Sequence, residues 1–341
     1  MDKKELKILL RLPNWLGDSV MVSPSFEILK EYFPNAVFSI VGSKASCGIY
    51  SRDSRVGNIY IDETKKQKNR FYSTIEFAKK VGKHDIAIAF TNHFFPALFL
   101  YATKSSLRIG YGKNFCFLLL NQKIKFICGI HQVLSYINLT SKICNRDLIH
   151  PNSKIDKNIK LKLIAKNIKH FHKDYSKRYV GINAGAAYGS AKRWEEKYFV
   201  EVALYFLKND CIVLLFGNDD DMGLQRISDS IKQQDNSKNL IDLVGKTDIN
   251  SLCDYISILD LFITNDSGPM HIAASFSVPL IAIFGPTDSK ETSPWCNNAI
   301  LLDKHLVCAP CKKRECPLSH HNCMKLITPD EVIMCANKLL R

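Results

Sequence analysis

Seven residues near the end of the sequence, Asn-Asp-Ser-Gly-Pro-Met-His at positions 265–271, form a segment suited to binding a diphosphate. The apolar run before them and the helical pattern after them predict a strand-to-helix turn. Backbone N–H groups at a helix start lack helical partners and carry partial positive charge, so Ser267 to Met270, including Gly268, can cradle phosphates. Asp266 precedes the cradle, where a carboxylate can bind sugar hydroxyls, and His271 lies one turn into the helix. The alternative is an ordinary helix cap with a buried histidine.

A second candidate site is the segment Gly-Ala-Ala-Tyr-Gly-Ser-Ala-Lys-Arg-Trp at residues 185–194, which we call the lysine loop. Its small residues follow a predicted strand and place Lys192 and Arg193 at the expected start of a helix. Cations are unfavourable at a helix N-terminus, so their presence there indicates a bound anion. A solvated Lys-Arg pair is the alternative.

The third candidate is Pro-Asn-Trp-Leu-Gly-Asp-Ser-Val at residues 13–20, after the first predicted strand. Gly17 permits close backbone approach, and Asp18 is expected at the carboxyl end of the strand. A single glycine does not make a dinucleotide fingerprint, so we do not expect phosphates here. Asp18 is either a helix cap or a catalytic carboxylate that faces a second domain.

The sequence contains twelve cysteines, and its N-terminal segment is a poor export signal. We therefore expect the thiols to be reduced. Four of them follow the spacing C-x2-C-x4-C-x6-C, with His320 and His321 nearby. That spacing is compatible with tetrahedral zinc, although only the first pair has the spacing of a zinc ribbon. We therefore expect a loop of reduced thiols and no metal. The cysteines of this segment, which we call the cysteine segment (residues 308–323), are Cys308, Cys311, Cys316 and Cys323.

The elements that must position these residues alternate between strand and helix. A length of 341 residues favours roughly two domains. Short runs that are apolar on both faces indicate strands of buried parallel sheets, and helical patterns lie between them. The predicted strands cover residues 7–12, 37–41, 57–61, 86–90, 107–109, 179–183, 211–216, 240–244, 261–264 and 279–284.

Two helices have clear sequence signals. Thr247 can cap a helix that runs to about Leu259, and Thr328-Pro-Asp-Glu is a capping box that opens a final helix to Leu340. Residues 154–178 hold nine basic and two acidic residues and no strong strand, so we expect an exposed helical connector that ends near Ser176. Ligands of such α/β domains bind beyond the carboxyl ends of the strands, and a cleft between two domains is the expected site.

The charge of the chain bears on its partners. Lys and Arg number 47 against 33 Asp and Glu, a formal net charge of +14, which favours nucleic acid, a membrane surface or a phosphorylated substrate. A solvated, lysine-rich surface is the alternative. No apolar run approaches the roughly 20 residues of a bilayer-spanning helix, and Arg11 interrupts the N-terminal apolar run, so a signal peptide is not expected.

Several motifs together resemble glycosyltransferase family 9, the lipopolysaccharide heptosyltransferases of Gram-negative bacteria. Asn-Asp-Ser-Gly-x-Met-His-x-Ala-Ala at 265–274 is similar to the family signature, and Trp-Leu-Gly-Asp at 15–18 to its N-terminal motif. The lysine loop and the cysteine segment resemble the heptosyltransferase II branch. The resemblance covers nearly the whole chain, in order.

The resemblance implies a GT-B fold, in which two Rossmann-like doubly wound α/β domains face each other across a cleft. Residues 1–176, with the basic connector 154–176, are then the acceptor-binding domain, and residues 177–341 bind the donor, ADP-heptose. The final helix, 328–341, is expected to pack back toward the N-terminal domain.

The resemblance also assigns roles by position. Lys192 matches the lysine at the donor diphosphate and Asp266 the acidic residue at the donor sugar, while Asp18 matches the general base. Asp221 is a weak match to the ribose contact, because the family usually has Glu there. The remaining donor-binding positions are Ser190, Thr247, Ser267, Gly268, Met270 and His271.

The implied reaction is inverting transfer of heptose from ADP-L-glycero-D-manno-heptose to the first heptose of the Kdo-lipid A inner core. Asp18 would accept the acceptor proton, and Lys192 with the Ser267 turn would stabilise the departing ADP without a metal or other cofactor. Asn14, Asn92 and His93 are acceptor-side candidates. The acceptor is anionic, and basic residues of the N-terminal half can contact it or anionic headgroups: Lys65, Lys66, Lys68, Arg70, Lys104, Arg108 and Lys113.

Two other functions compete with this one. Heptosyltransferase I would add heptose directly to Kdo, but the lysine loop and the cysteine segment favour the II branch. A zinc-bearing nucleic-acid module would need aromatic side chains among the basic residues 154–178, which offer only Phe171 and Tyr175. We therefore expect no nucleic-acid partner and a cytoplasmic enzyme at the periphery of the inner membrane.

Overall fold

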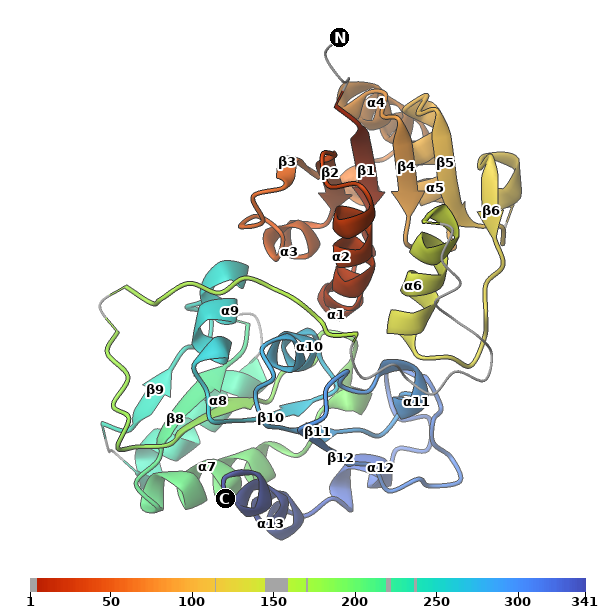
Figure 1. Cartoon of the computed structure of the whole chain (residues 1–341). Helices are drawn as coiled ribbons and strands as arrows, with labels where there is room; N and C mark the ends of the chain where they lie inside the picture. The colour runs from red at the N-terminus through yellow and green to blue at the C-terminus, as the bar shows by residue number, and fades with distance from the viewer. Residues whose placement is uncertain (1–4, 114, 145–158, 170, 219–221, 236–237) are drawn as a thin grey trace. The chain divides into compact units, whose positions relative to one another are not determined.

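The computed structural model describes residues 5–113, 115–144, 159–169, 171–218, 222–235 and 238–341. The chain divides into two compact units, residues 1–164 and 165–341. In both units strands alternate with helices along the chain (Figure 1). No described helix is long and apolar enough to span a bilayer.

The first unit contains a parallel sheet of six strands in the order β3-β2-β1-β4-β5-β6. Its central strand β1 is buried and pairs in register with β2 and β4, so that Leu9 lies opposite Ser39 and Ala87. The apolar runs of the sequence form these strands because both faces of the sheet are covered. The strands are β1 (Lys7–Arg11), β2 (Val37–Gly42), β3 (Val56–Ile61), β4 (Ile86–Ala89), β5 (Leu107–Tyr111) and β6 (Gln122–Ile124).

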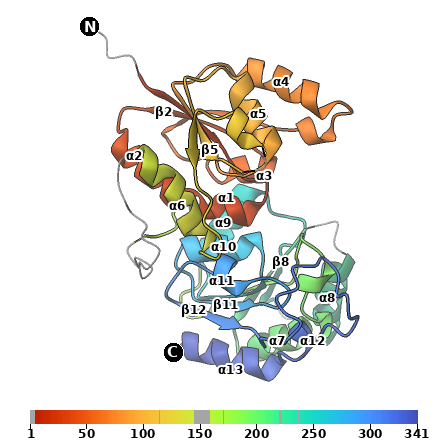
Figure 2. The ribbon, with the colours of Figure 1, turned by 90° about the vertical axis from the view of Figure 1, so that its right-hand side faces the viewer.

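Helices cover both faces of this sheet (Figure 2). On one face α2 packs against α6, and on the other α4 packs against α5. The apolar sides of α4 and α5 join Leu9, Val41 and Ala87 of the sheet in one core. The helical elements are α1 (Leu16–Met21), α2 (Ser23–Tyr32), α3 (Lys44–Gly48), η1 (Thr64–Lys66), α4 (Arg70–Val81), α5 (Phe94–Ala102), η2 (Cys116–Leu118) and α6 (Gln132–Ile143).

The second unit repeats this topology, with a parallel sheet in the order β12-β11-β10-β7-β8-β9. Strand β7 takes the place of β1 and pairs with β8 and β10. Every predicted strand is present, but the edge strands β6 and β12 were not predicted. The strands are β7 (Tyr179–Asn183), β8 (Ile212–Phe216), β9 (Leu240–Asp242), β10 (Leu261–Asn265), β11 (Leu280–Ile283) and β12 (Ala299–Leu302).

Helix α7 packs against α8 and α13 in the second unit, and α9 against α10. Phe199, Val202 and Phe206 of α7 lie in the core with Val332 and Ala336 of α13. The predicted capping box at Thr328 is confirmed. The helical elements are η3 (Ser190–Lys192), α7 (Glu196–Lys208), α8 (Met222–Gln234), α9 (Ile249–Ser257), α10 (Gly268–Ser275), α11 (Ser289–Thr292), α12 (Asn322–Lys325) and α13 (Pro329–Leu339).

The prediction of a helical connector is wrong for the described part of residues 154–178, which contains neither helix nor strand. The described residues 165–169 and 171–178 instead belong to the second unit, which therefore begins before the predicted boundary at Ser176. Lys166 N–H donates to Asp254 at 2.7 Å, and Lys173 Nζ contacts Asp260 at 3.0 Å. Helix α13 uses its buried face within its own unit, and its packing toward the first unit stays a prediction.

In each sheet the chain reverses its strand order at one place, between β1 and β4 in the first unit and between β7 and β10 in the second. Loops diverge there at the carboxyl edge, which is where open α/β sheets bind ligands. Asp18 follows β1, Asn92 and His93 follow β4, the lysine loop follows β7, and Asp266 follows β10. The fold therefore brings these predicted residues of each unit to its switch point, while Thr247 follows β9 at the edge of the second sheet.

Candidate functional site

Lys192 and Asp266 form a close ion pair at the switch point of the second unit. Lys192 Nζ lies 2.5 Å from Asp266 Oδ2, and the side chains are only 13% and 6% exposed. The Thr287 hydroxyl donates to the same carboxylate oxygen at 2.6 Å. The expectation that Lys192 lies at the start of the helix is wrong, because Lys192 belongs to η3 and α7 begins only at Glu196, with an acidic first turn.

Asparagine side chains hold the two loops of this pair in place. Asn265, at the end of β10, accepts from Trp194 N–H at 3.1 Å and donates to Ala184 O at 2.7 Å, so it links the turn to both ends of the lysine loop. Asn183, at the end of β7, donates to the hydroxyls of Thr264 and Ser267. The backbone on either side of Lys192 and Asp266 is therefore fixed by hydrogen bonds that are buried or partly buried.

The turn at Ser267 opens α10 as predicted, with Ser267 at the N-cap position. Its hydroxyl makes no capping hydrogen bond and contacts Asn183 and Thr264 instead. Pro269 has no N–H, so the backbone donors of the turn are those of Ser267, Gly268 and Met270. The side chains of Met270 and His271 are buried, and a ligand at the turn would meet their backbone.

The other predicted donor residues are Ser190, Thr247 and Asp221. Ser190 is exposed in η3, beside Lys192. Thr247 lies in the loop after β9, two strand positions from β7, and Asp248 rather than Thr247 caps α9, because its carboxylate accepts from Ser251 N–H. Asp221 lies outside the described residues.

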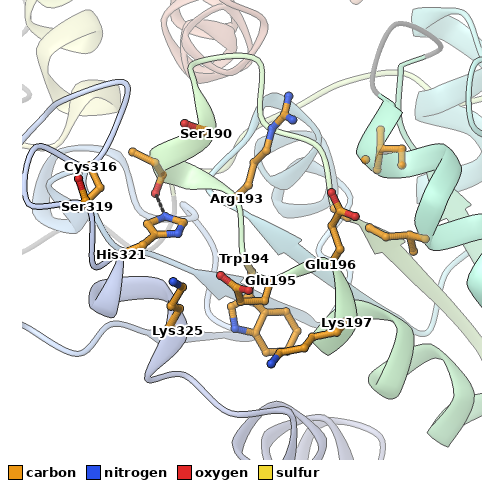
Figure 3. A pocket seen from close by; sticks show the side chains of 15 residues that line it. Ser190, Arg193, Trp194, Glu195, Glu196, Lys197, Cys316, Ser319, His321 and Lys325 are labelled. Atoms are coloured by element: carbon orange, nitrogen blue, oxygen red, sulfur yellow. Dashed lines mark hydrogen bonds between the residues drawn. The ribbon is translucent and has the colours of Figure 1, made fainter.

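A cavity of about 650 Å³ adjoins the lysine loop (Figure 3). It is bounded by Ser190, Arg193 and Trp194, by helix α8, and by Cys316 and His321 of the cysteine segment. Neither Lys192 nor Asp266 lines this cavity, and Ser190 alone of the described donor candidates does so.

The four cysteines of the cysteine segment gather in one region of the second unit. Burial raises the pKa of Cys323 to about 11, and Cys316, Cys308 and Cys311 lie near enough to add to that rise. Backbone N–H groups of residues 318–321 outweigh the effect of burial and lower the pKa of Cys316. Among the described residues, no group of three or more His, Cys, Asp or Glu side chains is arranged to hold a metal ion.

The first unit contains a cavity of about 570 Å³ at its own switch point. It brings together the predicted general base and the predicted acceptor residues, namely Asp18, Asn14, Asn92 and His93. Asp18 lies in the first turn of α1, where Trp15 is the N-cap residue, so the alternative in which Asp18 caps this helix is wrong. Asp18 also faces Tyr136, whose pKa is raised by burial and then by this carboxylate.

One wall of this cavity is cationic. Lys65 and Arg70 line it, and the Arg70 guanidinium lies 3.8 Å from the centre of the Phe95 ring. Burial, and then the neighbouring Arg70 and Arg11, lower the pKa of Lys65. Among the described residues, Arg70 Nε and Thr91 Oγ1 are buried without a hydrogen-bond partner, and both residues line the cavity. A bound anion would relieve the crowded charges and accept from Arg70.

Arg11 holds in place the segment that carries Lys65. Its guanidinium donates to Leu12 O at 2.7 Å and pairs with Asp62 at 2.5 Å. Burial acts to raise the pKa of Asp62, but Arg11 and hydrogen bonds from Thr64 outweigh it and hold that pKa below its ordinary value. The buried pair ties the end of β1 to the loop after β3, which carries Lys65.

Sequence reasoning missed several residues of both sites. Thr287 follows the Gly-Pro pair after β11. Its position beyond the carboxyl end of a strand could have identified it as a site residue. Asn183 is the last residue of β7, so its position at the carboxyl end of a strand could have identified it as well. The aromatic residues Tyr111, Phe126 and Tyr136 of the first cavity carry no such signal, because their sequence surroundings are those of ordinary core residues.

Comparison with known proteins agrees with this arrangement. A protein of Campylobacter jejuni named lipooligosaccharide heptosyltransferase 2 is 37% identical over 346 aligned residues, which cover 98% of this chain and 99% of that protein. The solved Escherichia coli ADP-heptose LPS heptosyltransferase II is 24% identical with a TM-score of 0.75, and 98% of each chain is covered. Escherichia coli heptosyltransferase WaaC with ADP is 14% identical with a TM-score of 0.76, covering 98% of this chain and all of that one.

These similarities confirm the predicted fold class, since solved heptosyltransferases share the two Rossmann-like α/β units. The sequence model of glycosyltransferase family 9 (heptosyltransferase) matches residues 74–322, well over half of the chain. The 37% identity to a heptosyltransferase extends over nearly all of both proteins. The chain therefore belongs to glycosyltransferase family 9, the heptosyltransferases, and is a glycosyltransferase.

Proposed function

We propose that this enzyme transfers heptose from ADP-L-glycero-D-manno-heptose to the first heptose of the Kdo-lipid A inner core, with inversion at the anomeric carbon. The observation that carries the proposal is that Lys192 pairs with Asp266 at one switch point and Asp18 shares a cavity with the acceptor candidates at the other. The names of the full-length relatives support the second heptose as the one added. The relative solved with ADP supports an adenine nucleotide donor.

In the proposed reaction the second unit holds the donor. Lys192 and the backbone donors at Ser267, Gly268 and Met270 would bind the diphosphate and stabilise the charge that grows on departing ADP. Asp266 would hold Lys192 and contact the sugar, and Ser190 would lie beside the diphosphate. Thr247 and Asp221 remain proposed contacts to adenine and ribose. The scheme requires no metal or other cofactor, because a lysine and a helix start supply the positive charge.

The first unit would hold the acceptor. Asp18 would take the proton from the attacking sugar hydroxyl as the bond to the anomeric carbon forms and the bond to ADP breaks. Asn14, Asn92 and His93, which share its cavity, would bind acceptor hydroxyls. Lys65 and Arg70 would bind a carboxylate or phosphate of the anionic inner core.

An acceptor comparison tests the proposal. We expect ADP release from ADP-heptose with heptosyl-Kdo-lipid A and at least about a hundredfold less with Kdo-lipid A, because an acceptor without the first heptose leaves polar groups of the site unpaired. Equal or faster reaction with Kdo-lipid A would instead show heptosyltransferase I activity. UDP- and GDP-heptose serve as donor controls and should be poor substrates.

We also place the enzyme at the cytoplasmic face of the inner membrane, bound peripherally. Residues 65–72, Lys-Lys-Gln-Lys-Asn-Arg-Phe-Tyr, join four cations to two aromatic side chains at the rim of the first cavity. Phe71 and Tyr72 are 51% and 58% exposed, and Lys66 and Lys68 are exposed beside them. Aromatic rings with lysines suit an interface with anionic headgroups.

Sedimentation with lipid vesicles tests this placement. We expect Lys66→Gln with Lys68→Gln to weaken binding to phosphatidylglycerol-containing vesicles by roughly tenfold or more, at about 1 kcal/mol per lysine. The matched control is Lys79→Gln with Lys80→Gln, an equal change in charge at the other end of α4. Equal loss in both pairs would show that total charge, and not this surface, binds the membrane.

A further inference from the structure

The cysteine segment lies against the lysine loop, although none of its cysteines enters the proposed reaction. His321 Nε2 lies 2.8 Å from Ala191 O, a contact drawn as a dashed line in Figure 3. Because a carbonyl only accepts, this ring nitrogen carries the hydrogen. Ala191 N–H donates in turn to Arg314 O at 3.0 Å. Both backbone polar groups of Ala191, the residue before Lys192, are thus bound by the cysteine segment.

A second set of contacts fixes the start of η3. The Tyr188 hydroxyl donates to Lys312 O at 2.9 Å, and the Tyr188 ring lies 4.8 Å from Lys192 Nζ and 5.5 Å from the Arg314 guanidinium. Gly189 has φ near +159°, and a Cβ at this position would stand 2.4 Å from Arg314 O. The lysine loop therefore follows the path of the cysteine segment closely.

The cysteine segment is itself anchored on both sides. Lys312 N–H donates to Pro286 O at 2.7 Å, in the loop that carries Thr287. His321 precedes α12, and its own carbonyl accepts from Met324 and Lys325 N–H at 3.1 and 3.0 Å. A histidine held in this way can transmit the rigidity of α12 to the backbone next to Lys192.

We propose that His321 is a positioning residue for Lys192, which it serves by holding the Ala191 carbonyl. This inference rests on the proposed role of Lys192 at the donor diphosphate. Loss of the hydrogen bond would free η3 to shift, and a shift of about 1 Å in a catalytic group is enough to lower turnover about a hundredfold. The cysteine segment then has a function without any metal, as a brace for the lysine loop.

Three variants test the inference. His321→Ala removes the hydrogen bond, His321→Gln keeps an N–H donor near the position of Nε2, and His305→Ala is the control, since His305 is 76% exposed. In His321→Ala we expect hydrogen exchange of the Ala191 and Lys192 amides to quicken about tenfold, because their local structure opens more easily. His321→Gln should restore slow exchange, and His305→Ala should not change it.

Kinetics test the consequence. We expect His321→Ala to lower kcat/KM for ADP-heptose ten- to a hundredfold, roughly, with rescue by His321→Gln. If His321 acts through Lys192, adding His321→Ala to Lys192→Ala should lower the rate by less than about twofold more. Unchanged exchange in His321→Ala, or fully additive losses in the double variant, would overturn the inference. Full activity in Lys192→Ala with faster exchange in His321→Ala would refute the role of Lys192 and with it the catalytic effect of His321, while supporting the hydrogen bond.

Discussion

Lys192→Ala should lower turnover with ADP-heptose by roughly a hundred- to a thousandfold, the usual effect of removing one preorganised charge contact to a leaving group. The ammonium lies 2.5 Å from Asp266 and is largely shielded from water, so its charge acts at low screening. The loss should appear in kcat as well as in affinity for ADP, because negative charge on ADP grows between the bound donor and the transition state. Steady-state rates and calorimetric ADP binding measure the two effects.

The same change leaves the Asp266 carboxylate buried, with the Thr287 hydroxyl still donating to it. An uncompensated buried charge is destabilising, so we expect a lower Tm in Lys192→Ala, and the double variant Lys192→Ala/Asp266→Asn should recover part of it. Lys232→Ala is the matched control, since Lys232 pairs with Asp242 at 2.5 Å in the same unit. Near-normal turnover in Lys192→Ala, or equal loss in Lys232→Ala, would refute the assignment.

The sequence was sufficient to predict ten of the twelve strands that the structure describes in the two sheets. Runs such as 179–183 and 261–264 are apolar on both faces and end in small or polar residues, which is the pattern that a covered parallel strand requires. Strand β6, Gln-Lys-Ile, was missed because two of its three residues are polar, so it forms no apolar run. Strand β12 is longer but half exposed, and it follows an irregular stretch of the chain.

The basic residues 154–178 misled the prediction for a physical reason. A charged segment without strand patterning is typical of a solvated helix, yet its described residues gain their order from partners far away in the sequence. Lys173 contacts Asp260, and the Phe171 ring packs against Tyr255. Contacts of this kind depend on tertiary structure, which overrides local preference.

The sequence predicted which residues belong to the candidate sites better than it predicted the contacts that these residues make. Strand ends and turn residues pointed to Lys192, Asp266 and Asp18, because parallel strands bring their carboxyl ends to one edge. The direct pairing of Lys192 with Asp266, and the part of Thr287 in it, depend on side-chain geometry that spacing does not reveal. The brace at Ala191 was hidden for the same reason, since it joins the His321 ring to a backbone carbonyl 130 residues away in the sequence.

Asp18→Asn should lower turnover by roughly a hundred- to ten-thousandfold, the usual contribution of a positioned general base. Asp18 is half-buried in the first turn of α1 and lines the cavity that also holds Asn14, Asn92 and His93. Asparagine has the same size but cannot accept the proton from an acceptor hydroxyl. Binding of ADP should change little, because the proposed donor residues belong to the other unit.

A purely structural role for Asp18 makes a different prediction. Trp15 is the N-cap of α1, and a carboxylate at Asp18 in the first turn interacts favourably with the helix start, which is worth about 0.3 to 1 kcal/mol. Asp18→Asn would then lower Tm slightly and leave the rate intact. Asp85→Asn is the control, since Asp85 accepts from Lys7 N–H at the opposite, amino edge of the same sheet. A full-speed Asp18→Asn enzyme means that another group takes the proton, whereas a slow enzyme with wild-type ADP affinity and Tm establishes Asp18 as the base.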